Sequence, residues 1–504
     1  MVVQHNMQAA NANRMLNVTT SAQSKSTEKL SSGYRINRAA DDAAGLTISE
    51  KMRKQIRGLD QASTNAQDGV SSVQTAEGAL TEVHSMLQRM NELATQAANG
   101  TNSKDSDRQA IQDEIDQLTT EIDRVSETTK FNETYLLKGE AGTKTINMKA
   151  HDAGLKGTLT DNGDGTATFV MDTLNAGDKV SIGGKQYTIG GEKADVIAAF
   201  GANGLNIDAN HQDVSVNGTT YKWYAGTVRT KDNILISAGY YSQDPSTLAD
   251  QAAATATSVG GKATTSAATL ADHAPNGSTI TVGSKSVTLM QDDGTKGGTA
   301  NDKIDDVDST VISKTKAYEL ASKELLAANQ IGDTKGNATV TKADGKTTLD
   351  ATNGDGTFKI KVGQAEVANS LSFSLHVGAD ADMTNKIQVN IDAMDSASLG
   401  IKGLNVKDAS GNAATYAVDA ISDAISKVSS QRSSLGAVQN RLEHTINNLD
   451  NVVENTTTAE SRIRDTDMAE EMVNYSKNNI LAQAGQSMLA QANQSNQGVL
   501  SLLQ

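Results

Sequence analysis

The chain of 504 residues has no cysteine, which excludes disulfides, thiolate catalysis and cysteine-ligated zinc. Its two prolines, Pro245 and Pro275, leave long helices uninterrupted elsewhere. Aromatic residues make up 3% of the sequence, which argues against the aromatic-lined pockets that small-molecule enzymes use. Apolar residues still reach 37%, enough for hydrophobic cores, and the length allows roughly three or four domains.

Excess positive charge and long apolar runs are also missing. The 45 basic residues face 60 acidic ones, and the net charge of −15 argues against binding to a nucleic-acid backbone. No apolar run approaches the roughly 20 residues that span a bilayer, so we expect a soluble protein without membrane insertion. The N-terminal stretch MVVQHNMQAANANRMLN lacks the basic region and apolar block of a signal peptide, so export would use a route that reads no such signal.

Motifs for catalysis or metal binding do not occur either. None of the seven histidines begins an H-E-x-x-H zinc helix, and no G-x-S-x-G elbow is present. The stretch ADGKTT at Ala343 lacks the upstream glycine of a phosphate loop. DNGDG at Asp161 has glycine where a calcium loop needs its second ligand, which favours a hairpin turn. The sequence around Asp41 and Asp42 predicts a polar linker followed by a helix start, and it does not favour a pair of catalytic carboxylates. We therefore predict no enzyme activity, no metal site and no cofactor.

Two interleaved heptad series dominate residues 48–97. The first series takes every seventh residue from Met52, and the second does so from Ile48. Their members are Met52, Leu59, Ala66, Val73, Leu80, Leu87 and Ala94, and Ile48, Gln55, Ala62, Gly69, Ala76, Val83, Met90 and Ala97. Apolar series sustained for this length predict a coiled-coil-like helix, and the small residues in them predict close packing.

Two further helices are expected to complete a bundle. After the turn ANGTNSKDSD, apolar residues are spaced 4, 3, 4 and 3 from Ile111 through Ile115, Leu118, Ile122 and Val125. The same pattern returns near the other end of the chain, with Arg432 and Gln439 in two seam positions. Its apolar members are Val418, Ile421, Ile425, Val428, Leu435, Leu442, Ile446, Leu449 and Val453. The bundle would thus be closed by segments some 300 residues apart.

The middle, from about Lys144 to Asn369, is rich in Thr, Gly, Asp and Val and predicts β-hairpins at SVNGTT, SIGGKQYTI, TVGSKSVTL and NGDGTFKIKV. The decapeptides at 180–189 and 280–289 share one plan, which predicts a repeated hairpin unit. Short helices are expected at 245–258 and 314–330. The fold class is therefore multi-domain α+β, mainly helical at both termini with a β-rich inserted outer domain.

The two ends carry apolar faces that the bundle does not explain. From Asn478 onward no residue is charged, and the apolar residues fall within an arc of roughly 140° on a helix. They are Ile480, Leu481, Ala484, Met488, Ala492, Val499, Leu502 and Leu503. A narrow face of a possible N-terminal helix carries Val3, Met7, Ala10 and Val18. The charged Arg14 falls on the same face and does not fit the apolar pattern. Alone in water both helices would be marginal, so we expect the termini to pair and then pack against the termini of other copies.

Several long stretches resemble bacterial flagellin. They are LSSGYRINRAADDAAGLTISEKMR at 30–53, QDGVSSVQTAEGALTEVHSMLQRMNELATQAANGT at 67–101, and AESRIRDTDMAEEMV with QAGQSMLAQANQSNQGVLSLLQ near the end. The resemblance covers about residues 1–140 and 370–504, and it implies a helical filament with both termini in its core. It implies five parts: filament-core helices at 1–45 and 460–504, bundle segments at 46–143 and 369–459, and a variable outer insertion at 144–368.

The resemblance also implies partners and a location. Flagellins are secreted unfolded by the flagellar type III apparatus, with a chaperone on the C-terminal helix, and they meet cap and hook-junction proteins in an extracellular homopolymer that serves motility. The stretch LQRMNELA resembles the segment by which Toll-like receptor 5 recognises flagellins, with Arg89, Leu93 and Glu114 as matching positions. Because Leu87 and Met90 occupy the seam, Gln88, Arg89, Glu92 and Leu93 are expected on the flanks and outer side.

Two alternatives remain open from the sequence. Leu93 could simply widen the core while Arg89 is a solvated charge. The whole chain could instead be a secreted adhesin or enzyme whose working part is the middle segment on a helical stalk, although no catalytic motif occurs there.

Overall fold

The computed structural model describes residues 6–99, 105–191, 213–249, 274, 276–282, 285–292, 302–342, 356–408 and 411–502; the side chains of 105, 282, 285 and 496–502 are outside this description. The chain forms two compact units. The first comprises Met1–Thr75, Ser372–Asn390 and Ser434–Gln504, and the second comprises Ala76–Leu371 and Ile391–Ser433. Helices α2 (Ala43–Ala98) and α10 (Asn412–Arg464) contribute to both units.

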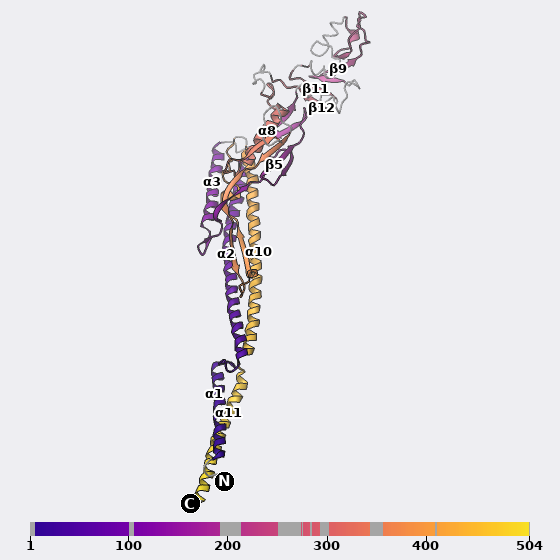
Figure 1. Cartoon of the computed structure of the whole chain (residues 1–504). Helices are drawn as coiled ribbons and strands as arrows, with labels where there is room; N and C mark the ends of the chain where they lie inside the picture. The colour runs from indigo at the N-terminus through magenta and orange to yellow at the C-terminus, as the bar shows by residue number, and fades with distance from the viewer. Residues whose placement is uncertain are drawn as a thin grey trace. The chain divides into compact units, whose positions relative to one another are not determined.

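In the first unit, α2 and α10 run side by side, as do α1 (Met7–Ser32) and α11 (Met468–Leu502) (Figure 1). Leu59 and Ala62 of α2 pack against Leu449 of α10. Further along α2, Ala66 packs against Leu442. Contacts that move forward along one helix therefore move backward along the other, so the two helices are antiparallel.

A hairpin covers this part of the bundle. Strands β17 (Leu371–His376) and β18 (Lys386–Ile391) pair with each other, with the 3₁₀ turn η4 (Met383–Asn385) between them. Val377 and Ile387 join the cluster around Ala66 and Leu442. A Cβ added at Gly69 would meet the end of the Leu375 side chain, which would have to shift, so glycine at this seam position lets the hairpin pack closely on α2.

The predicted seam of α2 is confirmed along most of its length. Apart from Gly69, its members from Ala62 to Ala97 are at most 1% exposed, and Leu59 is 8% exposed. The prediction is wrong at the N-terminal end, where Ile48 is 47% exposed and Gln55 is exposed. Partners that cover the helix from about Leu59 onward do not bury that first part of the stripe.

The polar residues in the α10 seam have defined partners. In the second unit, Arg432 Nη2 lies 2.7 Å from Glu77 Oε1 of α2. In the first unit, Gln439 Nε2 donates to Glu443 Oε1 one turn along α10, at 2.9 Å. An arginine with its long apolar stem can occupy a partly buried seam position when a carboxylate receives its charged end.

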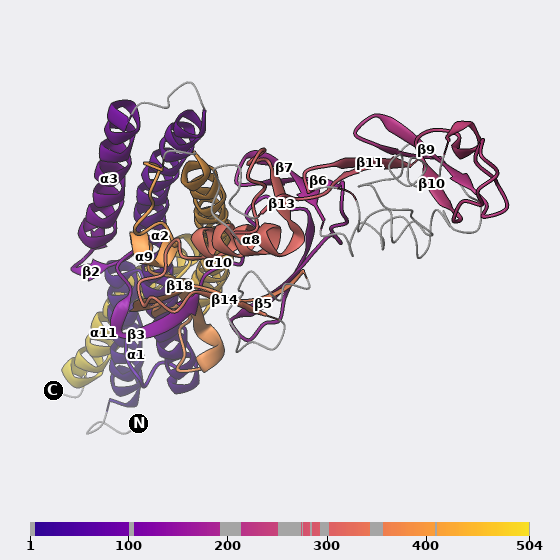
Figure 2. The same ribbon diagram turned by 90° about the horizontal axis from the view of Figure 1, so that it is seen from above.

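Helix α3 (Asp105–Thr128) forms the short third helix of the bundle in the second unit and lies beside α2 (Figure 2). Ile111, Ile115 and Ile122 are buried, which confirms the predicted apolar face, while Leu118 and Val125 are half-buried. After α3 the chain forms β1 (Lys130–Phe131) and β2 (Thr134–Tyr135) before it enters the β-rich middle.

Where the middle begins and ends, β3 (Glu140–Asn147) pairs antiparallel with β16 (Gln364–Asn369). The Met148 N–H donates to the Gly363 carbonyl at 2.8 Å. Met148, Ala365 and Val367 form a small core with Ala397 of α9 (Ser396–Leu399). The two ends of the β-rich segment are therefore adjacent and hydrogen-bonded.

Two sheets and helix α8 (Lys314–Asn329) share one core in the middle segment. The first sheet has the order β14-β15-β5-β4, and the second has the order β13-β7-β6. Their strands are β4 (Gly157–Asp161), β5 (Thr166–Met171), β6 (Lys179–Ile182), β7 (Lys185–Gly190), β13 (Val311–Ser313), β14 (Thr339–Lys342) and β15 (Thr357–Lys361). Phe358 is central to this core, since its ring centroid lies 6.1 Å from those of both Phe169 and Tyr318.

A further five-stranded sheet has the order β10-β9-β8-β11-β12. Its strands are β8 (Val214–Val216), β9 (Thr219–Tyr224), β10 (Gly239–Tyr241), β11 (Thr279–Val282) and β12 (Lys285–Thr288). Trp223 and Tyr240 meet edge to face at 5.2 Å between ring centroids. This sheet therefore has a small core of its own, in which Tyr240 packs with aliphatic residues such as Val216 and Ile280.

The hairpin predictions are confirmed where residues are described. Val180 pairs with Tyr187 and Ile280 pairs with Val287, so both decapeptides form the same antiparallel hairpin. Asn217 and Gly218 both adopt positive φ in the SVNGTT turn, as a two-residue hairpin connection requires. DNGDG at Asp161 is likewise a hairpin turn between β4 and β5.

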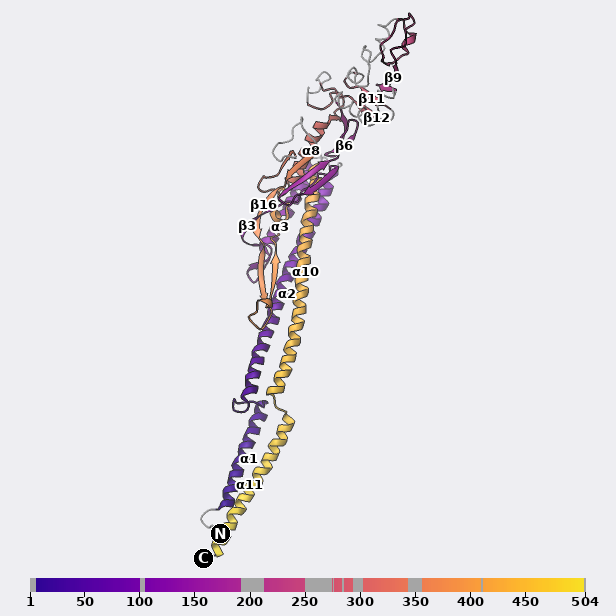
Figure 3. The same ribbon diagram turned by 45° about the vertical axis from the view of Figure 1, so that its right-hand side comes forward.

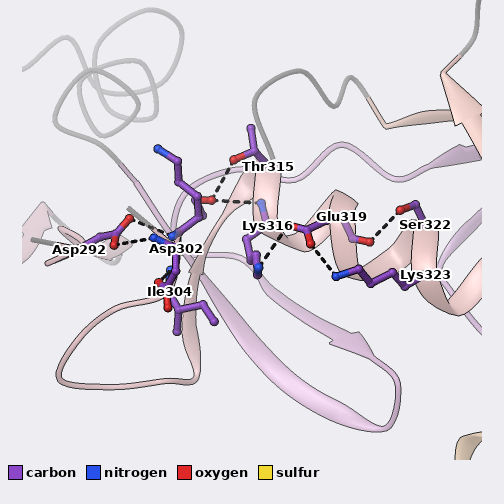
Figure 4. Close-up of polar contacts among 10 residues, drawn as sticks. Asp292, Asp302, Ile304, Thr315, Lys316, Glu319, Ser322 and Lys323 are labelled. Atoms are coloured by element: carbon purple, nitrogen blue, oxygen red, sulfur yellow. Dashed lines mark hydrogen bonds and ion pairs between the residues drawn. The ribbon is translucent and has the colours of Figure 1, made fainter. Parts of the chain in front are cut away.

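Of the two predicted short helices, the one at 314–330 is present, whereas only a 3₁₀ turn is described at the start of 245–258. Helix α8 is confirmed, and Ser313 caps it by accepting the N–H of Lys316. Glu319 of α8 lies between Lys316 and Lys323, and Asp292 accepts the N–H groups of Asp302 and Lys303 beside the start of the helix (Figure 4). At 245–258, the structure has a 3₁₀ turn, η2 (Pro245–Thr247), and residues 250–258 lie outside the description.

Candidate functional site

The terminal helices α1 and α11 pair with each other inside the first unit (Figure 3). Asn6 Nδ2 donates to the Ala492 carbonyl at 3.0 Å near the start of α1, and Lys29 lies 3.8 Å from Glu471 near its end. Between these contacts, Gly485 faces Leu16, and nearby Ala482 is 8% exposed. The helices are therefore antiparallel, and the expected pairing of the termini is present in a single chain.

A groove of about 820 Å³ follows the seam between α1 and α11. Its lining comes from both helices and contains apolar, amide and hydroxyl side chains but no charged residue. The lining residues are Gln8, Asn11, Ala12, Met15, Leu16, Thr19, Leu481, Ala484, Gly485, Met488, Gln491, Ala492 and Ser495. Surface helices normally present charge to water, so an uncharged groove on paired helices is a candidate protein interface.

The predicted C-terminal residues divide between this groove and the open surface. Leu481, Ala484, Met488 and Ala492 line the groove, whereas Ile480 is 67% exposed and is not part of the lining. Leu503 lies outside the described residues. Val499 and Leu502 belong to α11, but their side chains are outside the description.

The predicted N-terminal face points away from α11. Met7 and Val18 are 69% and 59% exposed, and Ala10 is exposed as well. Ala10, Arg14 and Val18 line a second, shallower hollow of about 670 Å³ on α1 itself. Val3 lies outside the described residues. The terminal pair therefore leaves the predicted N-terminal apolar face uncovered.

Sequence reasoning missed several exposed apolar residues of the same pair. Met15 lines the groove from α1 and is 60% exposed. Met468, Met472 and Val473, at the start of α11, are also exposed. The spacing of Met468 and Met472 by four residues was the available signal, but acidic residues between them obscured it.

A compact joint connects the terminal pair to the start of α2 and the end of α10. The Arg35 N–H donates to the Arg464 carbonyl at 2.7 Å, and the Thr466 N–H donates to the Gly33 carbonyl at 3.0 Å. The guanidinium carbons of Arg53 and Arg464 lie over the Tyr34 ring, at 5.5 and 4.8 Å from its centroid. Both arginines are attracted to the electron-rich ring faces, so the joint fixes both chain ends together.

The Asp41–Asp42 pair lies in the linker before α2, as predicted. Asp42 accepts the Gly45 N–H at 2.8 Å and so caps the helix. The backbone N–H groups of Arg38 and Asn37 donate to Asp41 and hold the pKa of its carboxyl below the usual range. These bonds give both carboxylates a structural role in the linker.

A second candidate site lies on α2 and α3 in the second unit. Arg89 Nε donates to Glu114 Oε1 at 2.9 Å, and Arg89 Nη1 donates to Glu92 Oε2 at 3.1 Å. Glu114, then Glu92, raise the pKa of Arg89 by accepting these hydrogen bonds. Gln88 is exposed on the same stretch and contacts His84. Four of the five predicted positions thus form one exposed patch.

Leu93 is the exception. Its side chain is 2% exposed, so the prediction that it lies on the flanks or outer side of α2 is wrong. The alternative, that Leu93 widens the buried core, is confirmed. Helix α2 has two helical neighbours, α3 and α10, and a helix with two neighbours buries a wider stripe than a two-series seam.

The described ranges contain neither a cluster of metal-binding side chains nor a membrane-spanning helix. There, no group of three or more histidine, aspartate or glutamate side chains could hold a metal ion. None of the helices described is both long enough and apolar enough to cross a membrane.

Paired terminal helices with uncovered apolar faces, a helical bundle and a β-rich insertion define a filament-forming structural subunit. The N-terminal helical region of bacterial flagellin matches residues 3–142, and the C-terminal helical region matches residues 418–503. The chain belongs to the bacterial flagellin family and is a structural subunit of the flagellar filament, a homopolymer.

Relatives match this chain from end to end. A flagellin of Clostridium tyrobutyricum is 38% identical over 99% of this chain and 100% of its own length. A flagellin of Bacillus subtilis is 34% identical over 100% of both chains, and one of Salmonella typhimurium is 35% identical over 97% of this chain and 96% of its own. The solved structure of FliC from Burkholderia pseudomallei aligns with 74% of this chain and 99% of that one at 18% identity, with a TM-score of 0.26, too low to support an argument.

Proposed function

We propose that this flagellin polymerises into an extracellular filament for motility, and that α1 and α11 form the filament core by packing against the same helices of other copies. The uncharged groove between α1 and α11 carries this proposal. Its apolar, amide and hydroxyl lining can be buried between identical subunits through hydrogen bonding and apolar contact, without neutralising any charge.

Large apolar side chains of the terminal helices remain exposed in one chain. Met7, Ile480 and Met488 are each more than 60% exposed on helices that otherwise contact mainly each other. Helices that bury so little of their apolar surface gain little from folding alone. Burial between copies supplies the missing stabilisation, so ordering of the termini is coupled to assembly.

The five-part division by assembly role belongs to the same proposal. Residues 1–45 and 460–504 supply the filament core, residues 46–143 and 369–459 supply the bundle, and residues 144–368 form the variable outer region. An export chaperone would occupy the C-terminal helix before assembly, and cap and hook-junction proteins would meet the same terminal helices at the ends of the filament.

We also propose that host Toll-like receptor 5 recognises the monomer. The exposed cluster of Gln88, Arg89, Glu92 and Glu114 supports this proposal, since an arginine with two nearby carboxylates offers directed polar contacts at a helical surface. Leu93 would act from beneath this patch by keeping α2 packed, because its side chain is buried.

Electron microscopy of the purified full-length protein after salting out tests the filament proposal. Long, uniform filaments are expected. Monodisperse particles under conditions that leave the protein folded, as judged by helical circular dichroism, would contradict it.

A further inference from the structure

Methionine is concentrated on the exposed surface of the terminal pair. Five methionines of α1 and α11 have side chains between 49% and 69% exposed: Met7, Met15, Met468, Met472 and Met488. Elsewhere in the described ranges, Met383 in η4 is the methionine of comparable exposure, at 74%. Met90, Met148 and Met171 are instead buried in the cores of the second unit.

Met15 and Met488 differ from the other exposed methionines because both line the uncharged groove. They contribute from opposite sides, one from α1 and one from α11, and are 60% and 61% exposed. Both residues are thus largely open to solvent in a single chain, and they lie where a second copy would exclude water under the proposed filament function.

A thioether in such a place is chemically vulnerable. A hydroperoxide transfers one oxygen atom to the methionine sulfur: the O–O bond breaks and an S–O bond forms. The sulfur loses two electrons, and hydrogen peroxide is reduced to water. The product, a sulfoxide, is a strong dipole with an acceptor oxygen in place of a flexible apolar group.

We propose that Met15 and Met488 are oxidation sites through which hydroperoxides block incorporation of the unassembled subunit, and that reduction of the sulfoxides by a methionine sulfoxide reductase restores it. The inference rests on the proposed filament function. Burial of an unpaired acceptor corresponds to about a tenfold loss of association, and two such groups in one groove act together. Once a filament has formed, the covered sulfurs are protected, so the sensitive form is the monomer.

The first experiment uses the full-length wild-type protein with its own internal control. Monomer is treated with hydrogen peroxide until roughly half of each exposed methionine is converted, the peroxide is removed by catalase, and the sample is polymerised. Filaments and residual monomer are then separated and mapped by mass spectrometry. Sulfoxide at 15 and 488 should be enriched in the residual monomer by about tenfold, while sulfoxide at 383 should divide evenly.

The second experiment compares each variant with itself before and after oxidation. Oxidation should raise the critical concentration of wild-type protein and of Met383→Leu by about tenfold or more. It should raise that of Met15→Leu with Met488→Leu far less, because leucine has no sulfur to oxidise. Treatment with sulfoxide reductase should return oxidised wild-type protein to its untreated value.

The outcomes separate the two proposals. Untreated wild-type protein that never polymerises would overturn the filament function, and this inference with it. Untreated protein that polymerises, with 15 and 488 sulfoxides entering filaments as readily as the 383 sulfoxide, would overturn this inference alone. If the double variant assembles poorly, the partition experiment on wild-type protein still decides the question.

Discussion

At the scale of single residues, charged side chains stabilise individual helices through close pairs. Glu319 of α8 lies 2.6 Å from Lys323 Nζ and 3.2 Å from Lys316 Nζ, and its side chain is 18% exposed (Figure 4). The hydrogen bond from Lys323 lowers the pKa of Glu319 below its ordinary 4.5, burial opposes this, and Lys316 adds to the lowering. A carboxyl with a lowered pKa stabilises the fold above its ordinary pKa, and that stabilisation is lost as the pH falls through the lowered value.

Glu319→Gln should therefore destabilise α8 by about 0.5–1 kcal/mol at pH 7, and the difference from wild type should shrink steadily below pH about 4. Hydrogen exchange of the α8 amides measures this, since comparing both proteins at one pH cancels the intrinsic exchange rate. Glu121→Gln, which removes the ion pair with Arg124 on α3, is the control and should leave α8 unchanged. Equal exchange of Glu319→Gln and wild type at pH 7 would contradict the argument.

Arg89 provides the second prediction at this scale. Arg89→Ala should weaken monomer binding to Toll-like receptor 5 by about 2 kcal/mol, because one side chain holds both Glu92 and Glu114 in the proposed patch. Arg124→Ala is the matched control, since Arg124 is similarly exposed and also pairs with a glutamate. Binding of purified receptor ectodomain to monomer is the measurement, and equal losses in both variants would reject a specific role for Arg89.

The effect of substituting Leu93 must be interpreted separately, because this side chain is buried. Leu93→Ala removes a side chain that is 2% exposed, which typically costs about 2–5 kcal/mol of folding free energy. A loss of receptor binding in this variant would therefore report on the packing of α2 as well as on recognition. Combining Leu93→Ala with Arg89→Ala would obscure the contribution of the arginine.

At the scale of elements, α1 and α11 pair with each other, and we propose that they also pack against other copies. Leu481 is 47% exposed in the groove, and Leu481→Lys would introduce a charge where the lining has none. Burying an unpaired ammonium between copies is strongly unfavourable, so the critical concentration for polymerisation should rise about tenfold or more.

The matched control for that substitution is Val307→Lys. Val307 is 67% exposed and belongs to the second unit, whereas Leu481 belongs to the first. It should polymerise like wild type, as measured by sedimentation of filaments over a range of concentrations. If Leu481→Lys sediments at the wild-type concentration, the groove is not the contact between copies.

At the scale of the whole molecule, the β-rich insertion returns to its starting point. The Met148 N–H donates to the Gly363 carbonyl; strand β3 ends directly before Met148, and its paired strand β16 begins directly after Gly363. Replacing residues 149–362 with Asn-Gly should therefore close β3 and β16 into a hairpin and leave assembly intact. Because the deletion also uncovers Tyr416, which is 5% exposed, the variant should carry Tyr416→Gln.

Electron microscopy and circular dichroism of this deletion variant measure the outcome. Filaments thinner than those of wild type are expected, with the helical signal per helical residue preserved. The control is the full-length chain with Tyr416→Gln alone. A deletion variant that unfolds while this control folds would mean that the insertion is part of the bundle core.

Features that depend on local periodicity could be predicted from the amino-acid sequence alone. Heptad spacing located α2, α3 and α10, and paired glycines and Asn-Gly located the hairpin turns, because these signals act over a few residues. The resemblance to flagellin identified the family without the tertiary structure. The missing charge after Asn478 also marked the terminal face, since charge is the ordinary requirement of a solvated helix.

Which apolar residues are covered, and by which partners, depends on the three-dimensional fold and could not be predicted from periodicity. Leu93 is buried and Ile48 is exposed, although the heptad pattern favours the reverse, because burial depends on how many neighbours a helix has at each level. Met15 and Met488 share a groove although they are far apart in the sequence, because the two ends of the chain fold back on each other as antiparallel partners. Periodicity defines the face of a helix, whereas the partner of that face is set by contacts between residues distant in the chain.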